Sequence, residues 1–173
     1  GTLPNNFELW LDSCSFNNNF LFIIFTNDDR KFKLPKNVKI ADMGSGAGFP
    51  AVVLAIMGWD VTCIESIGKK VSFLQAVKEE LDLENLTIFH GRLEDFVRHL
   101  PAKSGNFVFT ARAFASLTKI MDYVARTKCR LFLLKGREIE SEITDAKRKY
   151  KFKYELTPSK TGDGFIIYVH FDR

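Results

Sequence analysis

The sequence predicts an α/β domain in which helices cover a mostly parallel sheet. From residue 38 onward, short apolar segments alternate with segments of helical character, as expected for consecutive strand–helix units. A glycine-rich stretch follows the first of these apolar segments, and an acidic residue closes the second. The length of 173 residues suffices for one such domain with its own core.

Five apolar segments predict the strands, and the segments between them predict the helices. The expected strands are residues 38–43, 60–65, 86–90, 106–111 and 130–134. The expected helices are residues 49–57, 68–81, 92–100 and 117–127, followed by a more polar one at 138–150. In residues 68–81, apolar side chains recur at three- and four-residue steps, which gives that helix one buried stripe.

The C-terminal segment changes style. Residues 152–156 and 164–171 flank a turn region and predict an antiparallel hairpin. Strand–helix units followed by a terminal hairpin are typical of class I S-adenosylmethionine-dependent methyltransferases, which have a Rossmann-like, mostly parallel seven-stranded sheet. We therefore expect a methyltransferase domain at residues 38–173. Residues 1–37 do not follow the alternation and predict a short, mostly helical N-terminal extension packed on the sheet.

A glycine loop follows the first predicted strand. Gly44, Gly46 and Gly48 alternate with other residues, whereas dinucleotide-binding loops place their third glycine where this chain has Phe49. Such a loop lets the backbone approach a ligand closely but suits one without a diphosphate. S-adenosylmethionine is the commonest ligand of that kind. Glycines at these positions are equally compatible with plain turns.

An acidic residue closes the next predicted strand. Glu65 follows the glycine loop by about one strand–helix unit, where a carboxylate can accept hydrogen bonds from both ribose hydroxyls of an adenosine. A lone glutamate at a strand end is more often merely solvated. The combination with the glycine loop favours a nucleoside-binding domain.

Composition excludes several other classes. No run of eighteen apolar residues occurs, so we expect no membrane span. The cysteines Cys14, Cys63 and Cys129 lie far apart and predict reduced core thiols in a cytoplasmic protein, and the three histidines share no ligand spacing, so no metal is expected. The net charge of +4 is compatible with a polyanionic partner.

Several motifs resemble those of the RsmG (GidB) family, which methylates N7 of a guanosine in bacterial 16S ribosomal RNA. They are residues 42–50 (DMGSGAGFP), 65–70 (ESIGKK), 91–96 (GRLEDF), 111–113 (ARA) and 134–136 (LKG). The likeness runs from about residue 8 to the C-terminus and includes Asp12-Ser13. It implies an rRNA methyltransferase with S-adenosyl-L-methionine as cofactor and 16S rRNA or the small ribosomal subunit as partner.

The resemblance also implies a set of cofactor-binding residues. They are Gly44, Gly46, Gly48, Phe49, Glu65, Ser66, Ile67, Leu93, Glu94 and Arg112. Glu65 would hold the ribose, Ser66 and Ile67 would flank the adenine, and Leu93 and Glu94 would line its edge. Two of these residues have simpler interpretations, since Leu93 suits a core position and an acid such as Glu94 favours the first turn of a helix.

Basic residues near the predicted carboxyl edge of the sheet are candidates for RNA contact. They are Lys69, Lys70, Lys135 and Arg137. Arg112 follows an apolar strand between two small alanines, which favours a role in holding cofactor or RNA over a structural ion pair. The lysine-rich run at 147–153 suits RNA, but lysines also protect an edge strand from pairing with other chains, and we favour that second interpretation.

The chain departs from the family pattern at several places. Its N-terminal extension is shorter than usual, which would affect RNA binding, and Glu65 replaces the commoner aspartate. Ala51 stands where a glycine is usual, and residues 126–130 lack the usual Pro-Gly-Gly turn. None of these changes removes a group that the predicted cofactor site needs.

The predicted chemistry needs little from the protein besides positioning. Guanine N7 carries an in-plane lone pair and no proton at neutral pH, so we predict no general base and no catalytic residue beyond a positioning role for Arg112. Two alternatives stay open: a noncatalytic RNA-binding or ribosome-assembly protein with the same fold, and a nicotinamide-dependent oxidoreductase. Phe49 and the terminal hairpin argue against the oxidoreductase.

Overall fold

The structure, a computed structural model, describes residues 37–46, 48, 50–102, 106–112, 114–158 and 164–171. All structural statements below concern these residues. The predicted N-terminal extension, Cys14, Phe49 and the Asp12-Ser13 motif lie outside them.

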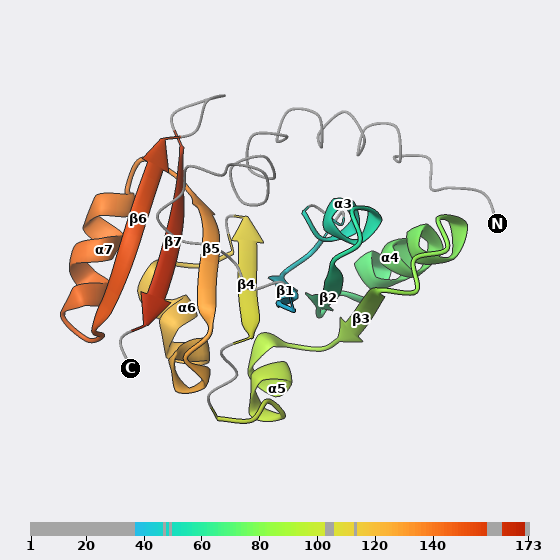
Figure 1. Cartoon of the computed structure of the whole chain (residues 1–173), viewed down its shortest axis with the longest axis horizontal. Helices are drawn as coiled ribbons and strands as arrows, with labels where there is room; N and C mark the ends of the chain where they lie inside the picture. Colours follow the sequence, from blue (N-terminus) through green and yellow to red (C-terminus); the bar gives the residue numbers. More distant parts are fainter. Residues whose placement is uncertain are drawn as a thin grey trace.

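One seven-stranded sheet organises the described chain, with the strand order β3-β2-β1-β4-β5-β7-β6 (Figure 1). The strands are β1 (Lys39–Met43), β2 (Asp60–Glu65), β3 (Leu86–His90), β4 (Phe107–Arg112), β5 (Arg130–Lys135), β6 (Phe152–Pro158) and β7 (Phe165–Phe171). The pairs among β1 to β5 are parallel, whereas β7 runs antiparallel to both β5 and β6. The predicted sheet with its terminal hairpin is confirmed.

Helices connect the parallel strands. They are α3 (Ala51–Ile56), α4 (Gly68–Glu80), α5 (Leu93–Arg98), α6 (Leu117–Val124) and α7 (Ile139–Lys147), with a 3₁₀ turn η1 at Ala125–Thr127. The predicted helix over 117–127 is therefore an α-helix followed by a 3₁₀ turn. Lys128 ends that turn in the left-handed region at φ 54°, so the α-helix does not continue.

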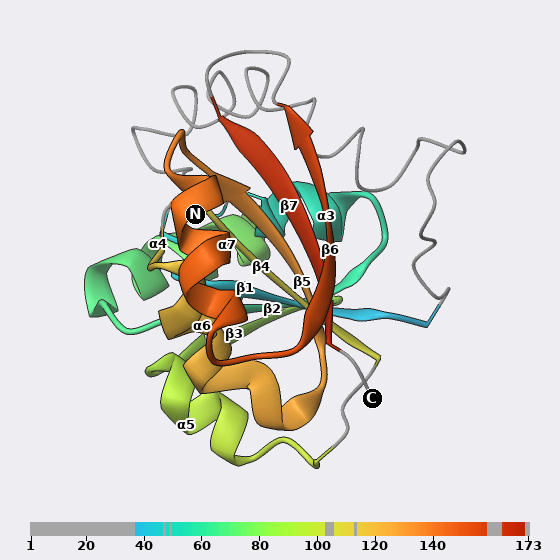
Figure 2. The same ribbon diagram turned by 90° about the vertical axis from the view of Figure 1, so that its left-hand side faces the viewer.

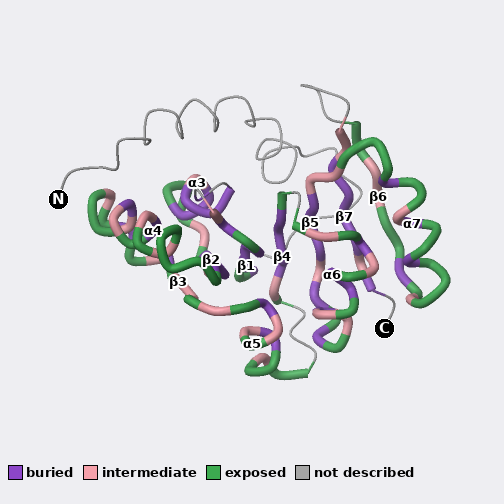
Figure 3. Tube along the Cα trace, turned by 180° about the vertical axis from the view of Figure 1, so that it is seen from behind, coloured by how far each residue is buried: buried purple, intermediate pink, exposed green. Residues whose placement is uncertain are grey.

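The helices cover both faces of the sheet. Successive strand residues point to opposite faces, so Ile40 packs with α3 and α4 while Ala41 packs with α5, α6 and α7. In Figure 2, α3 and α7 lie on opposite sides of β7. Figure 3 shows the central strands buried and the outer helix surfaces exposed. Burial on both faces explains why the strands read as continuous apolar runs.

Two of the predicted core thiols fall within the described chain. Cys63 and Cys129 are free and buried, and burial raises the pKa of each thiol to about 12. Since the thiolate is the reactive form, both side chains are inert packing groups. No described helix is long and apolar enough to span a bilayer, and no group of three or more metal-ligating side chains occurs in the described part.

Candidate ligand-binding site

A cavity of about 400 Å³ opens where the carboxyl ends of β1, β2, β3 and β4 meet. Parallel strands bring the loops that follow them to the same edge of the sheet, so residues far apart in sequence converge there. Most of the predicted cofactor residues line this cavity: Gly44, Glu65, Ser66, Ile67, Leu93, Glu94 and Arg112. Gly46 and Gly48 belong to the same loop but do not line the cavity.

The loop after β1 needs glycine at its first position for two reasons. Gly44 has φ 65°, in the left-handed region that other residues rarely adopt. A Cβ atom added there would come within 2.8 Å of Cδ2 of Phe114. The Gly44 N–H donates to the Ile64 carbonyl at 2.9 Å, which holds the loop beside the end of β2.

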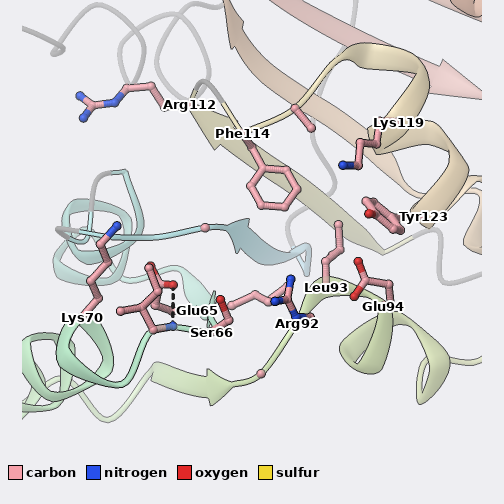
Figure 4. A pocket seen from close by; sticks show the side chains of 15 residues that line it. Glu65, Ser66, Lys70, Arg92, Leu93, Glu94, Arg112, Phe114, Lys119 and Tyr123 are labelled. Carbon is pink, nitrogen blue, oxygen red and sulfur yellow. Dashed lines mark hydrogen bonds between the residues drawn. The ribbon is translucent and has the colours of Figure 1, made fainter.

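Glu65 lies at the end of β2 and is held from two sides. Its side chain is buried, and the residue is only 5% exposed. The Gly46 N–H donates to Oε1 at 2.9 Å, and the Ile67 N–H donates to Oε2 at 3.1 Å. Figure 4 shows the Glu65 side chain among the lining residues. Each oxygen keeps a further lone pair for a ligand hydroxyl. The carboxylate is thus oriented by backbone groups before any ligand binds.

Leu93 and Glu94 begin α5 at another side of the cavity. Leu93 is 3% exposed, packs in the core and also lines the cavity, whereas its contact with an adenine stays a prediction. Glu94 lies near Tyr123 of α6 (Figure 4). Burial and the Glu94 carboxylate raise the pKa of the Tyr123 hydroxyl above its ordinary value.

Four cationic side chains line the cavity: Lys70, Arg92, Arg112 and Lys119. They come from α4, the start of α5, the end of β4 and α6, and they surround the opening in Figure 4. Among the described lining residues only Glu65 and Glu94 are acidic, so this part of the lining has an excess of positive charge. Lys70 thus lines the same cavity as the predicted cofactor residues.

Asp42 lies behind the loop and was not among the predicted site residues. It is 1% exposed, and Thr110 Oγ1 donates to its Oδ1 at 3.0 Å. Its Oδ2 has no hydrogen-bond partner among the described residues. Burial raises the pKa of this carboxyl to about 7, against the lowering effects of the Thr110 and Ser45 hydroxyls and the Arg112 charge. An acid two residues before the first glycine of an alternating-glycine loop was the sequence signal for it.

Lys135 requires a correction. Its side chain is only 8% exposed, and its Nζ lies 2.8 Å from Glu142 Oε1 and donates to the Ala115 carbonyl at 2.5 Å. The ammonium therefore ties the β4–α6 loop to α7 and does not join the exposed docking surface that the sequence predicted. Lys69 and Arg137, by contrast, are exposed.

The lysine-rich run at 147–153 makes local contacts. Lys147 Nζ lies 4.0 Å from the Phe152 ring centroid, and Lys149 Nζ lies 2.7 Å from Asp122 Oδ1. The run leads into β6, the edge strand of the sheet. These contacts favour the interpretation as a protected sheet edge over that as an RNA-binding patch.

The sequence missed several lining residues, notably Phe114, Lys119, Tyr123 and Arg92. Lys119 and Tyr123 reach the cavity because α6 packs beside α5, a tertiary contact that no local pattern shows. Arg92 follows a predicted strand by two residues and Phe114 follows another by three, and that position was the available signal.

Comparison with known proteins places the chain in a family. A family model described as rRNA small subunit methyltransferase G matches residues 27–161. The chain belongs to this family. It is 38% identical over 142 residues to a protein of Hyphomonas neptunium named ribosomal RNA small subunit methyltransferase G, covering 79% of this chain and 65% of that protein. A Lactococcus lactis protein of the same name is 39% identical over 116 residues, or 64% of this chain and 49% of the relative.

This member of the methyltransferase G family thus spans about half to two thirds of the length of these curated relatives. A second family model, of unknown function, matches residues 1–46.

Solved structures show the fold. A mutant of MtNAS in complex with S-adenosylmethionine superimposes with a TM-score of 0.67 at 16% identity, over 98% of this chain and 68% of that one. A SAM-dependent methyltransferase from Aquifex aeolicus gives 0.63 at 15% identity, over 94% and 98%. An rRNA methylase from Streptococcus thermophilus gives 0.59 at 13% identity, over 92% and 95%. The predicted class I methyltransferase fold is confirmed.

Proposed function

We propose that the chain transfers a methyl group from S-adenosyl-L-methionine to N7 of a guanosine in 16S ribosomal RNA. The observation that carries this proposal is the buried Glu65 carboxylate, fixed by the N–H groups of Gly46 and Ile67 at the side of the cavity. The family and the names of its relatives support the reaction class and the RNA substrate.

The cavity fits the cofactor in size and in polarity. Its volume of about 400 Å³ is within the usual range for small-molecule sites, roughly 300–1,000 Å³. Glu65 offers two acceptors to the ribose diol, and Leu93 and Ile67 offer apolar surface to the adenine. The left-handed Gly44 leaves the loop backbone open to close approach by the methionine part. Phe49 is predicted from the sequence alone to line the same side of the site, since it lies outside the described residues.

Positioning is the chain's main contribution to the reaction. When bound, the cofactor supplies an activated sulfonium methyl group, and guanine N7 attacks it with a lone pair that carries no proton. Neither a histidine nor a cysteine occurs among the described residues that line the cavity. Holding two reactants in line contributes roughly 7–11 kcal/mol in intramolecular analogues, so positioning is sufficient as a source of rate enhancement.

The positive cavity mouth suits an RNA substrate in the cytoplasm. Lys70, Arg92, Arg112 and Lys119 would meet phosphates around the target nucleotide, with Lys69 and Arg137 farther out. The N7 edge lies in the deep, narrow major groove of A-form RNA. The acceptor would therefore be a looped or unstacked guanosine, in free 16S rRNA or in the small ribosomal subunit.

Methyl transfer from labelled cofactor to purified small ribosomal subunits tests the proposal. We expect the unsubstituted chain to incorporate label, and borohydride–aniline cleavage of the product RNA to locate it at one N7-methylguanosine. Arg112→Ala and Glu65→Ala should lower the rate at least tenfold, whereas Glu84→Ala, in an exposed turn, should not change it. Label on another atom, or no incorporation by the unsubstituted chain, would contradict the proposal; the second result would favour a noncatalytic RNA-binding protein.

A further inference from the structure

Phe114 is a large apolar side chain that the fold leaves open to solvent. It follows the end of β4 by two residues, lines the cavity and is 39% exposed. Other phenylalanines nearby stack on one another: Phe96 contacts Phe89, Phe107 and Phe109 edge to face. None of the ring–ring contacts found in the described part of the chain involves Phe114. One aromatic face is therefore available inside a polar cavity (Figure 4).

The ring of Phe114 lies against Gly44 in the loop after β1. Cδ2 of Phe114 lies 2.8 Å from the point where a Cβ on Gly44 would be. The absence of a side chain at Gly44 thus makes room for the ring, and the ring lies against the loop that the cofactor would cross.

The strand order shows which part of the cofactor would face Phe114. Along the sheet edge the strands run β3, β2, β1, β4. Under the proposed function, Leu93 after β3 holds the adenine, Glu65 at the end of β2 holds the ribose, and Gly44 after β1 supports the methionine part. The next position along this edge belongs to Phe114, beyond the sulfur and on the side where the methyl group must leave.

We propose that Phe114 stacks on the acceptor purine and stabilises the positive charge that the base acquires during methyl transfer. This inference rests on the proposed function. In the transfer, the N7 lone pair forms a bond to the methyl carbon while the C–S bond breaks and its electron pair returns to sulfur. The cofactor becomes a neutral thioether, and the purine becomes a cation.

An aromatic face is well suited to that change of charge. Stacking holds a neutral base, and a cation over an aromatic ring is attracted more strongly still. The contact with Phe114 therefore strengthens along the reaction, which lowers the barrier and not only the dissociation constant. If Arg112 and Lys119 faced the acceptor purine, their positive charges would repel the charge that the purine acquires. Both cations therefore suit the RNA phosphates instead.

Substitution of Phe114 in the whole 173-residue chain tests this inference. In Phe114→Leu we expect cofactor affinity by calorimetry to stay within twofold of the parent and kcat on small ribosomal subunits to fall about tenfold. Phe114→Tyr, which restores an aromatic face, should recover most of the rate. Ile56→Ala, which trims another exposed apolar side chain away from the cavity, should leave kcat unchanged.

A binding measurement gives a readout that does not depend on turnover. With S-adenosylhomocysteine bound, the parent chain should bind 7-methylguanosine monophosphate at least fivefold more tightly than guanosine monophosphate, and Phe114→Leu should lose that preference. Loss of cofactor affinity in Phe114→Leu would overturn the inference, because the ring would then belong to the cofactor site. An unchanged kcat would also overturn it. If the parent chain neither binds the cofactor nor transfers methyl groups, the proposed function fails and this inference fails with it.

Discussion

Glu65 holds two loops at once, because its carboxylate offers two acceptor oxygens together with a negative charge. Both carboxylate oxygens accept backbone N–H groups, one from Gly46 and one from Ile67. A hydrogen bond from a buried donor to a charged acceptor contributes roughly 1.5–3 kcal/mol. The residue is therefore structural, and under the proposed function it also binds the ribose.

Glu65→Gln should weaken cofactor binding at least tenfold. The substituted amide has one acceptor oxygen, so its NH₂ group must face the N–H of either Gly46 or Ile67, and a ribose hydroxyl loses a charged partner. Calorimetric titration with S-adenosylmethionine measures the effect. Glu84→Gln, at an exposed position, is the matched control. Equal affinities for Glu65→Gln and the parent would show that the carboxylate does not bind the ligand.

Gly44→Ala should weaken cofactor binding more than Gly58→Ala does. Gly44 and Gly58 both have positive φ, 65° and 98°, so alanine is strained at either position. Only at Gly44 does the new Cβ meet a neighbour, at 2.8 Å from Phe114, whereas nothing lies within 4 Å at Gly58. We expect Gly44→Ala to abolish cofactor binding and Gly58→Ala to preserve it. Calorimetry measures cofactor binding by both variants, and urea denaturation measures their stability. A larger effect of Gly58→Ala on binding would contradict the prediction.

Asp42 predicts a pH dependence of stability. Its carboxyl has a pKa of about 7 in the folded chain because of burial, against the ordinary 3.8. Between these values the folded state holds a proton that the unfolded state has released, so the free energy of unfolding falls as pH rises from about 4 to about 7. At 1.36 kcal/mol per pKa unit, the loss amounts to at most ~4 kcal/mol.

Asp42→Asn is the variant that isolates this effect. The amide keeps an acceptor for the Thr110 hydroxyl but cannot ionise. Urea denaturation at pH 5 and pH 8 should therefore show a larger decrease for the parent than for Asp42→Asn. Parallel decreases in the two proteins would assign the pH dependence to other groups.

At the scale of secondary-structure elements, the loop after β4 is tied to α7 through one carboxylate. Glu142 Oε1 lies 2.8 Å from Lys135 Nζ and also accepts the Leu117 N–H, at 2.8 Å, where α6 begins. The lysine also donates to the Ala115 carbonyl. These contacts position the start of α6, and with it Lys119 and Tyr123, beside the cavity.

Glu142→Ala should destabilise the chain by roughly 2–4 kcal/mol, because it leaves the buried Lys135 ammonium without its counter-charge. Asp95→Ala removes the partner of Arg98 from an exposed ion pair, and such pairs contribute little. Urea denaturation compares the two. Similar losses would mean that the Lys135–Glu142 pair is no more important than a surface contact.

The sequence predicted the elements well where the pattern is local. The predicted strands and helices agree with the structure except near their ends, because glycines, prolines and apolar periodicity act over a few residues. The predicted helix over 117–127 has its last turn as a 3₁₀ turn at Ala125–Thr127, a local change that the sequence pattern does not reveal. Lys135 was misjudged because its burial depends on the return of α7.

The candidate site shows the same division. Residues at strand ends, such as Gly44, Glu65 and Arg112, could be found because the carboxyl edge of a parallel sheet is where ligands bind. Lys119 and Tyr123 could not, since they reach the cavity only through the packing of α6 beside α5. Phe114 had the right position but carried no charge or motif to mark it.

At the scale of the whole molecule, positive charge is concentrated where the RNA would enter. The chain has a net charge of +4, and four cations line one cavity. Phosphate contacts release counterions, so RNA affinity should fall with salt. Two lysines near the edge strand, by contrast, contact Phe152 and Asp122 and do not line the cavity.

Lys70→Ala should weaken binding to 16S rRNA and reduce the slope of log affinity against log salt by about 0.7–0.9, the value expected for one phosphate contact. Lys153→Ala, an exposed substitution on β6, should leave the slope unchanged. Filter binding from 50 to 300 mM salt measures both. An equal change of slope in the two variants would mean that the sheet edge contacts RNA as much as the cavity mouth does.

Calorimetric titration of the chain with S-adenosylmethionine is the decisive measurement for the proposed cofactor site. We expect one binding site per chain, loss of that site in Glu65→Ala, and its preservation in Glu84→Ala. Absence of binding to the folded parent chain, or undiminished binding by Glu65→Ala, would contradict the proposed site.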